Sequence, residues 1–312
     1  MTAMRSIRLL VLAAVASCAP LARAAAPAPP STPQTTFATP EEATQALIAA
    51  AEPFDLPVLT KLLGPDGVDL VVSEDVVQDK NRSAAFAAKA KERSKVVRDA
   101  KNPKKATIVV GDDDWPMPIP LVQKGGRWLF DSKAGRQEIL FRRIGTNELD
   151  AIEVCRGFVE AQNEYASERH DGARINQYAQ QIVSTRGKQD GLAWQNADGT
   201  WAGPVGEGIA RVIAQGYTTK YEPYHGYYFK VLKGQGPSAP MGAMDFVVKG
   251  AMIGGFALTA APSDYGVTGI MTFIVSHDGT VYEKDFGADT LKAFQARTIY
   301  DPDSTWSPVA DD

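Results

Sequence analysis

Residues 255–284, GFALTAAPSDYGVTGIMTFIVSHDGTVYEK, decide the fold of the second half of this 312-residue chain. Short runs within this stretch and just before it alternate apolar and polar residues, as strands with one buried face do. The alternating runs are 227–232, 245–249, 255–260, 268–275 and 281–284. Because the gaps between them are short and rich in turn residues, we expect an antiparallel meander.

Helical patterns flank these strands. A threonine that can serve as N-cap opens a helix predicted over 146–169, and shorter helices are predicted at 175–182 and 209–215. The apolar stripe of the first helix consists of Leu149, Ile152, Cys155 and Val159. The tail through Trp306 is expected to pack back on the sheet. Residues 145–312 are therefore predicted to form one α+β domain, with a helix on an antiparallel meander.

The preceding region, 37–144, carries its own helix and strand signals. In Thr39-Pro40-Glu41-Glu42, an N-cap hydroxyl is followed by proline at the first helical position and by glutamate three residues on. Further helices are predicted at 59–64 and 81–98, strands at 107–110, 115–121 and 127–130, and a hairpin turn at 123–126. This order predicts a separate α+β domain that resembles the cone-shaped fold of nuclear-transport-factor-like and cystatin-like domains.

Four stretches together carry a family resemblance. They are DDWPMPIPLV at 113–122, YHGYYF at 224–229, GGFAL at 254–258 and YGVTGIMTF at 265–273. They are similar to blocks of the secreted bacterial family catalogued as domain of unknown function 2950, and the likeness covers about residues 37–306. The resemblance implies an exported bacterial protein, and it implies no established activity.

The second domain is also similar to the globular head of type IV pilins and pseudopilins. AQNEY at 161–165, YA at 178–179, GYYF at 226–229 and DGTV at 278–281 carry this likeness. Pilins have a long apolar helix directly ahead of the head, whereas this chain has an entire domain there. The likeness therefore implies only a fold in which a helix packs on an antiparallel sheet.

Residues 1–24 have the pattern of a secretory signal peptide. Two arginines precede an apolar run over 9–19, which is shorter than the ~20 residues that cross a bilayer, and Ala22-Arg23-Ala24 offers a small-x-small cleavage site. The alternative is a lipobox, Val15-Ala16-Ser17-Cys18, in which Cys18 becomes the lipidated first residue. Residues 25–36, rich in alanine and proline, form a linker. Both alternatives predict an exported, periplasmic protein, and the second anchors it by lipid to the outer membrane.

Charge and cysteine content argue against several classes of protein. The formal net charge of −4 disfavours nucleic acid as a partner. Cys155 stands alone once Cys18 is removed or lipidated, so no internal disulfide is expected, and its amphipathic context predicts a buried thiol. The three histidines lack metal-ligand spacing, so no metal or other cofactor is expected. His277 is predicted to lie in a hairpin turn, and His170 at the exposed end of a helix.

Aromatic residues around one histidine form the candidate binding surface. Tyr224, His225, Tyr227 and Tyr228, together with Trp115, offer rings that can stack on a partner and a side chain that can donate or accept a proton. Packing at the start of a strand is the structural alternative for the same residues. The patterns favour an exported, non-catalytic cell-envelope protein, a binding or scaffold module for a protein or envelope partner. The alternative is an envelope hydrolase in which His225 works with a distant carboxylate.

Overall fold

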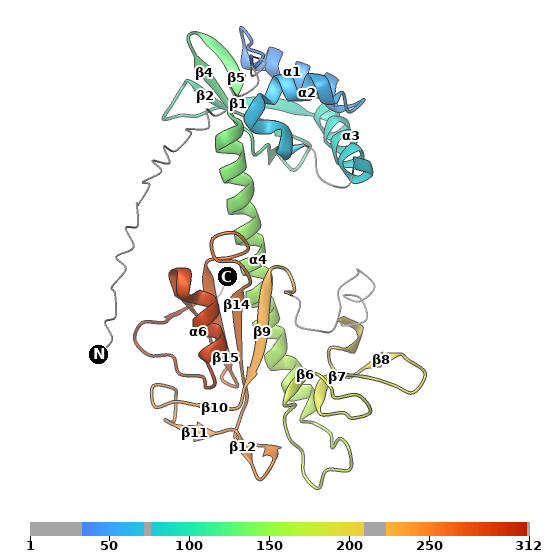
Figure 1. Ribbon diagram of the computed structural model, residues 1–312, viewed down its shortest axis with the longest axis vertical. Coiled ribbons are helices and arrows are strands. Elements are labelled where there is room, and N and C mark those ends of the chain that lie inside the picture. Colours follow the sequence, from blue (N-terminus) through green and yellow to red (C-terminus); the bar gives the residue numbers. More distant parts are fainter. Residues whose placement is uncertain (1–32, 72–75, 209–222, 311–312) are drawn as a thin grey trace, which may run out of the picture.

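The computed structural model describes residues 33–71, 76–208 and 223–310. Two packed units lie at the two ends of the long helix α4 (Figure 1). No helix within the described ranges combines the length and the apolar character that crossing a membrane requires. The predicted signal peptide with Cys18, most of the linker, and the helix predicted at 209–215 lie outside the described residues.

The first unit packs helices against a five-stranded antiparallel sheet. Its helices are α1 (Pro40–Ala51), α2 (Leu56–Leu63), the 3-10 helix η1 (Pro65–Leu70) and α3 (Val76–Glu92). Its strands are β1 (Ser94–Arg98), β2 (Lys105–Val110), β3 (Trp115–Pro116), β4 (Leu121–Lys124) and β5 (Arg127–Phe130). The strand order is β1-β2-β4-β5, and β3 pairs with β2. A core that includes Leu47, Leu59, Ile108 and Trp128 fills the space between helices and sheet.

Two local predictions for the first unit are confirmed. The Thr39 hydroxyl accepts a hydrogen bond from the Glu42 amide at 3.1 Å and caps α1 as predicted. The Glu42 carboxylate accepts a hydrogen bond from the amide of Ala38, the residue before the N-cap, at 3.0 Å. Gly125 and Gly126 have φ values of 58° and 78° and join β4 to β5 in a two-residue turn.

Of two other predictions for this unit, one is wrong and one is confirmed only in part. The helix predicted over 81–98 ends at Glu92, and residues 94–98 form β1. Val96 and Val97 are β-branched and fit a strand, and Val96 pairs with Ile108. The run predicted as a strand over 115–121 pairs with β2 at both ends, through β3 and through Leu121 of β4. Residues 117–120 between these ends belong to no strand, because the prolines lack the N–H group that a ladder needs.

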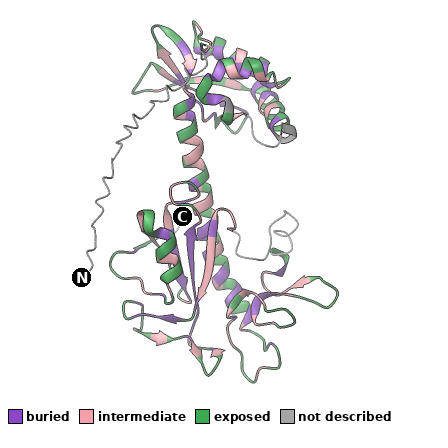
Figure 2. Cartoon of the chain, in the orientation of Figure 1, coloured by how far each residue is buried: buried purple, intermediate pink, exposed green. Residues whose placement is uncertain are grey.

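Helix α4 (Ser132–Tyr165) is longer than the sequence pattern indicates. Its predicted start at residue 146 is wrong, because Asp131 caps the helix through a 3.1 Å hydrogen bond from the Ala134 amide. The first turn is fixed to the first unit, where the Ser132 hydroxyl donates to the Leu63 carbonyl at 2.7 Å. Figure 2 shows that the stretch of α4 between the two units is mostly exposed or half-buried. The helix therefore connects the two cores as a spacer.

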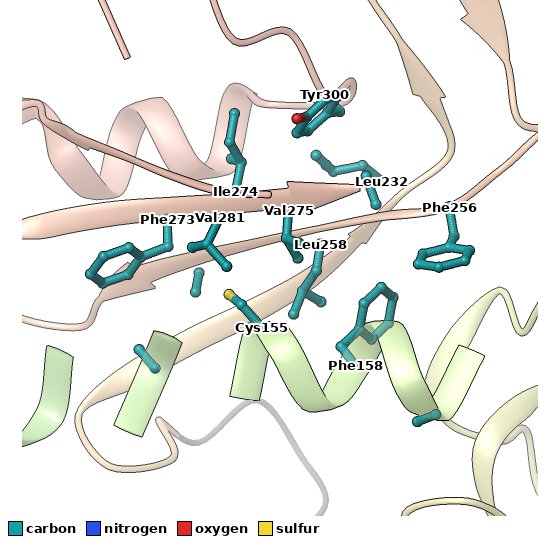
Figure 3. Packing of buried hydrophobic residues seen from close by; sticks show 14 of the residues in the cluster. Cys155, Phe158, Leu232, Phe256, Leu258, Phe273, Ile274, Val275, Val281 and Tyr300 are labelled. Carbon is teal, nitrogen blue, oxygen red and sulfur yellow. The ribbon is translucent and has the colours of Figure 1, made fainter. Parts of the chain in front are cut away.

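The second unit is built on a five-stranded antiparallel sheet. Its strands are β9 (Tyr227–Leu232), β14 (Ala257–Pro262), β15 (Met271–Ser276), β16 (Val281–Asp285) and β17 (Ser307–Pro308), in the order β17-β16-β15-β14-β9. Helices α4 and α6 (Thr290–Ala296) lie on opposite sides of this sheet (Figure 3). Cys155 and Phe158 of α4 point toward Val275 and Leu258, whereas Ile274 points toward α6. The predicted helix-on-meander arrangement and the buried Cys155 are confirmed.

Within the described part of the chain, three smaller sheets of two or three strands each accompany this sheet. A three-stranded group contains β6 (Gln181–Val183), β7 (Gly191–Gln195) and β8 (Trp201–Ala202). Two-stranded pairs join β10 (Gly234–Gln235) with β11 (Met244–Asp245), and β12 (Val247–Val248) with β13 (Ala251–Met252). The 3-10 helix η2 (Gly287–Asp289) precedes α6, and β17 brings the tail back to the sheet as predicted.

Three predictions for the second unit are wrong. The segment 175–182 is not helical, because the Gln162 side chain binds both the amide and the carbonyl of Ala179 at 2.8 Å and leads the chain into β6. The run 245–249 stays outside the main sheet, since the chain reverses at Lys249, where φ is 50°. His170 is buried rather than exposed: its Nε2 lies 2.9 Å from the Tyr165 carbonyl oxygen, and its ring stacks on the Tyr165 ring.

Candidate functional site

The candidate site is a tight turn at the entry to β9. Tyr224 and Tyr227 exchange two backbone hydrogen bonds, each of 2.9 Å, across His225 and Gly226. The φ values of His225 and Gly226 are 46° and 75°, which is the type I′ hairpin geometry. Positive φ is uncommon for a residue with a Cβ atom, so holding His225 in this turn costs conformational free energy.

A carboxylate on α4 holds the histidine of this turn. Nδ1 of His225 lies 2.5 Å from Oδ2 of Asp150, and both side chains are about one-third exposed. The imidazole also stacks on the Tyr224 ring, with 4.1 Å between ring centroids and 23° between planes. Among the described residues no hydrogen bond engages Nε2 of His225, so this atom can meet a partner or a proton.

Two neighbouring residues of α4 fasten the adjoining loop. The Asn147 amide group donates to the Thr268 carbonyl at 2.8 Å. Oε1 of Glu148 accepts hydrogen bonds from the backbone amides of Ile270 at 2.8 Å and Met271 at 3.0 Å. These are charge-assisted hydrogen bonds to backbone donors, which are stronger than neutral ones. One turn of α4 therefore fixes both the loop and the candidate turn.

Gly226 is required where the turn meets this loop. A Cβ atom at this position would lie 2.8 Å from the Asn147 side-chain nitrogen and 2.8 Å from Cβ of Thr268. Its positive φ also favours glycine. Its close contacts with Asn147 and Thr268, together with its positive φ, explain why glycine follows His225 in this turn.

Tyr227 belongs to the core and not to an exposed surface. Its side chain is fully buried, and its hydroxyl donates to the Met271 carbonyl at 3.0 Å. Burial, together with the charge of Glu148, raises the pKa of Tyr227. Burial and Glu148 also raise the pKa of Glu283. The phenol of Tyr227 therefore stays neutral and supports the turn from below.

The remaining predicted site residues lie apart from the turn. Tyr228 is half-buried, with its ring 6.3 Å from that of Phe294 on α6. Trp115 belongs to the first unit, where the residue is 39% exposed and its ring centroid lies 5.6 Å from the Arg142 guanidinium carbon. Trp115 also borders a small hollow with Phe86. The structure thus brings together Tyr224 and His225 and adds Asp150, for which the sequence offered no signal.

Other candidate groups have structural partners. The three aspartates at 112–114 form exposed ion pairs with Lys89, Arg93 and Lys95. Burial raises the pKa of the Cys155 thiol to about 12, which makes it a poor nucleophile. In the described part of the chain, no group of three histidine, cysteine or acidic side chains is arranged to hold a metal ion.

Comparison with known proteins identifies a family and no activity. No curated protein and no solved structure matches the chain. One family model, described as "Protein of unknown function (DUF2950)", matches residues 34–309. This range includes both packed units and the whole of α4. Because the match covers most of the chain, the protein belongs to the DUF2950 family.

Proposed function

We propose that this protein is an exported, non-catalytic component of the cell envelope, and that it acts as a binding or scaffold module for a protein or envelope partner. Its first unit is proposed to have a cystatin-like or nuclear-transport-factor-like fold, and its second a pilin-like fold. The lengths and order of the helices and strands support these two likenesses.

Helix α4 is the observation that carries the scaffold proposal. Its 34 residues correspond to about 50 Å of helix at about 1.5 Å per residue. Along its length it presents Phe141, which is 58% exposed, and Leu149, which is 61% exposed and lies between two residues that contact the second unit. Apolar side chains exposed on a helix of this length are suited to contact a partner, and a long helix holds two units at a set spacing.

The turn at 224–227 supplies a second, more polar contact. Tyr224 and His225 are half-buried, and the bond to Asp150 together with the ring stacking fixes their positions before any partner arrives. Side chains that are already ordered lose less conformational entropy on binding. This turn is therefore the contact that we expect to be most sensitive to substitution.

The N-terminal sequence supports export. Its charged start, apolar run and small-x-small site have the order of a signal peptide, and Cys18 gives a lipidated alternative. In bacterial cells, we expect the mature chain to begin at Ala25, or at a lipidated Cys18, and to occur in the envelope fraction. Mass spectrometry of the purified N-terminus tests this directly. An intact N-terminus in the cytosolic fraction would contradict export.

A matched set of variants tests the binding proposal. Chemical crosslinking of envelope fractions is compared for the wild type, Tyr224→Ala with His225→Ala, and Ile175→Ala. Ile175 is 50% exposed and lies outside the candidate site, so it serves as the control. We expect the double variant to lose a specific crosslinked partner that Ile175→Ala keeps. Identical crosslinking in all three proteins would remove the turn from the proposal.

The histidine–aspartate pair favours a second candidate, an envelope hydrolase. Nδ1 of His225 bonded to Asp150 leaves Nε2 as a potential general base. In that case the purified protein hydrolyses an ester or a cell-wall fragment, His225→Ala abolishes turnover, and Asp150→Asn lowers it. Turnover that His225→Ala leaves unchanged would exclude this site as the source of activity.

A further inference from the structure

The second unit has a further surface feature, away from the turn at 224–227, where no functional residue was predicted. A hollow of about 350 Å³ lies where the end of α6 meets β16 and the tail. Phe286 and Trp306 form its aromatic wall, with ring centroids 5.6 Å apart and planes at 68°. Its charged residues are Lys284, Arg297, Asp301 and Asp303.

Two cations share this aromatic pair. The guanidinium carbon of Arg297 lies 4.8 Å from the Trp306 centroid and 5.5 Å from the Phe286 centroid. Nζ of Lys284 lies 4.8 Å from the Phe286 centroid and 5.8 Å from the Trp306 centroid. Ring faces attract cations at these distances, so the wall holds both positive groups at the hollow.

Arg297 has unused hydrogen-bonding capacity. Its Nε atom is buried without a hydrogen-bond partner, and no carboxylate within the described residues lies close enough for an ion pair with its guanidinium. Burial lowers its pKa, although Asp303 and Asp301 oppose the shift. A buried donor without a partner is costly, and the Arg297 side chain lines the hollow, so an oxyanion bound there would give its guanidinium hydrogen bonds that it otherwise lacks.

The acidic side of the hollow also retains acceptor capacity. Oδ1 of Asp301 accepts the Ser238 amide at 2.8 Å, and Oδ1 of Asp303 accepts the Thr305 amide at 2.9 Å. Neither bond uses the second carboxylate oxygen. Two cations and two carboxylates make the formal charge of the hollow zero, so a ligand with both charges matches it better than a multiply charged anion does.

We propose that this hollow binds a small zwitterion, a free amino acid or a short peptide. The ligand carboxylate meets Arg297 and Lys284, and the ligand ammonium meets Asp301 and Asp303. The volume is at the lower end of the range for ligand pockets, about 300–1,000 Å³, and suits one or two residues. This site goes beyond the proposed scaffold function and does not depend on export.

The buried Nε–H of Arg297 provides a direct probe. Its ¹H–¹⁵N signal is followed in the full chain during titration with alanyl-alanine, N-acetyl-alanyl-alanine, alanyl-alanine amide and inorganic phosphate. We expect a saturable downfield shift with alanyl-alanine, and binding at least about tenfold tighter than that of either singly charged peptide or of phosphate. No shift with alanyl-alanine would overturn the proposal. Phosphate that binds equally well would also overturn it, because the hollow would then hold an adventitious ion only.

Variants separate the site from the rest of the fold. Calorimetric titration with alanyl-alanine is expected to show at least about a tenfold loss of affinity in Arg297→Gln and in Lys284→Gln. The control Lys292→Gln changes an exposed α6 residue outside the hollow and is expected to bind normally. Asp301→Asn is expected to weaken alanyl-alanine and leave N-acetyl-alanyl-alanine unaffected. Unchanged affinity in Lys284→Gln would contradict the assignment, even if Arg297→Gln fails to fold.

Discussion

Glycine substitutions along α4 test whether this helix is continuous between the two units. Gly145 and Gly157 lie inside α4, and a Cβ atom added at either position meets no atom within 4 Å. Alanine is favoured over glycine in a helix interior by about 0.8–1.0 kcal/mol. We therefore expect Gly145→Ala and Gly157→Ala each to raise the free energy of unfolding by about 1 kcal/mol. The two sites are distant enough for their effects to add.

Gly135→Ala is the matched substitution with the opposite expected sign. A Cβ atom there would lie 2.7 Å from Cγ1 and 3.0 Å from Cα of Ile119. Overpacking of this kind costs about 1–3 kcal/mol, which exceeds the gain in helix propensity. A net loss of about 1 kcal/mol is expected, because the first turn of α4 packs closely against the first unit.

Urea denaturation followed by circular dichroism measures all three variants. The midpoints should shift in the stated directions while the dependence on urea concentration stays constant. The reasoning is refuted if Gly145→Ala is neutral or destabilising. That result would place residue 145 outside the helix and restore the helix start at residue 146 that the sequence pattern indicated.

Three further predictions concern the contacts of α4 with the second unit. Glu148→Ala removes the acceptor of two backbone amides at the entry to β15, so we expect urea denaturation to show a free energy of unfolding lower by about 2–3 kcal/mol. The control is Glu153→Ala, at an exposed position of α4, and equal effects of the two substitutions would contradict the contact. Burial raises the pKa of Cys155 from 9.0 to about 12, so between these pH values the unfolded chain releases a proton that the folded chain keeps. The contribution of Cys155 to the free energy of unfolding is therefore full below about pH 9 and falls as pH rises toward 12. Denaturation of the wild type and of Cys155→Ala at several pH values measures this loss, and parallel pH profiles would refute it. Asp150→Asn disrupts a pair that is one-third exposed, so we expect at most about 1 kcal/mol of destabilisation and a clear change in the ring signals of His225 by NMR, whereas unchanged signals would show that the pair does not form in solution.

The residue pattern predicted four of the five strands of the central sheet. Four of the five alternating runs lie in β9, β14, β15 and β16. The two central strands, β14 and β15, are buried on both faces because α4 and α6 cover the two sides of the sheet, so they were recognised by their apolar content rather than by strict alternation. The run 245–249 alternates equally well, yet it lies in two short hairpins. Its outcome depends on the reversal at Lys249 and Gly250, where φ is 50° and 86°, and periodicity does not report such a turn.

The ends of α4 could not be predicted from local signals. Gly145 resembled a boundary because glycine is a poor helix former, but its cost of about 1 kcal/mol is small beside the cap at Asp131 and the packing at both ends. The segment 175–182 had a helical pattern, and its conformation depends on Gln162, which binds Ala179 from another element. Tertiary contacts decided both cases.

The candidate site was predicted in part. Aromatic residues around His225 drew attention to the turn, and the structure places Tyr224 and His225 together there. Asp150 was missed because it lies 75 positions away and meets His225 only where α4 crosses the sheet. Tyr227 could not be distinguished from its half-buried neighbours, since both faces of β9 carry aromatic residues and only packing against Met271 shows which ring is fully buried.

The central claim is that α4 is one unbroken helix joining two separately packed units, and a distance measurement tests it most directly. Spin labels at Lys133→Cys and Glu160→Cys, both exposed on α4, would be separated by about 40 Å along a continuous helix at about 1.5 Å per residue. Buried Cys155 should remain unlabelled. Double electron–electron resonance is expected to give a single narrow distribution near that distance. A broad distribution, or a clearly shorter distance, would show a hinge within α4 and contradict the spacer on which the proposed function depends.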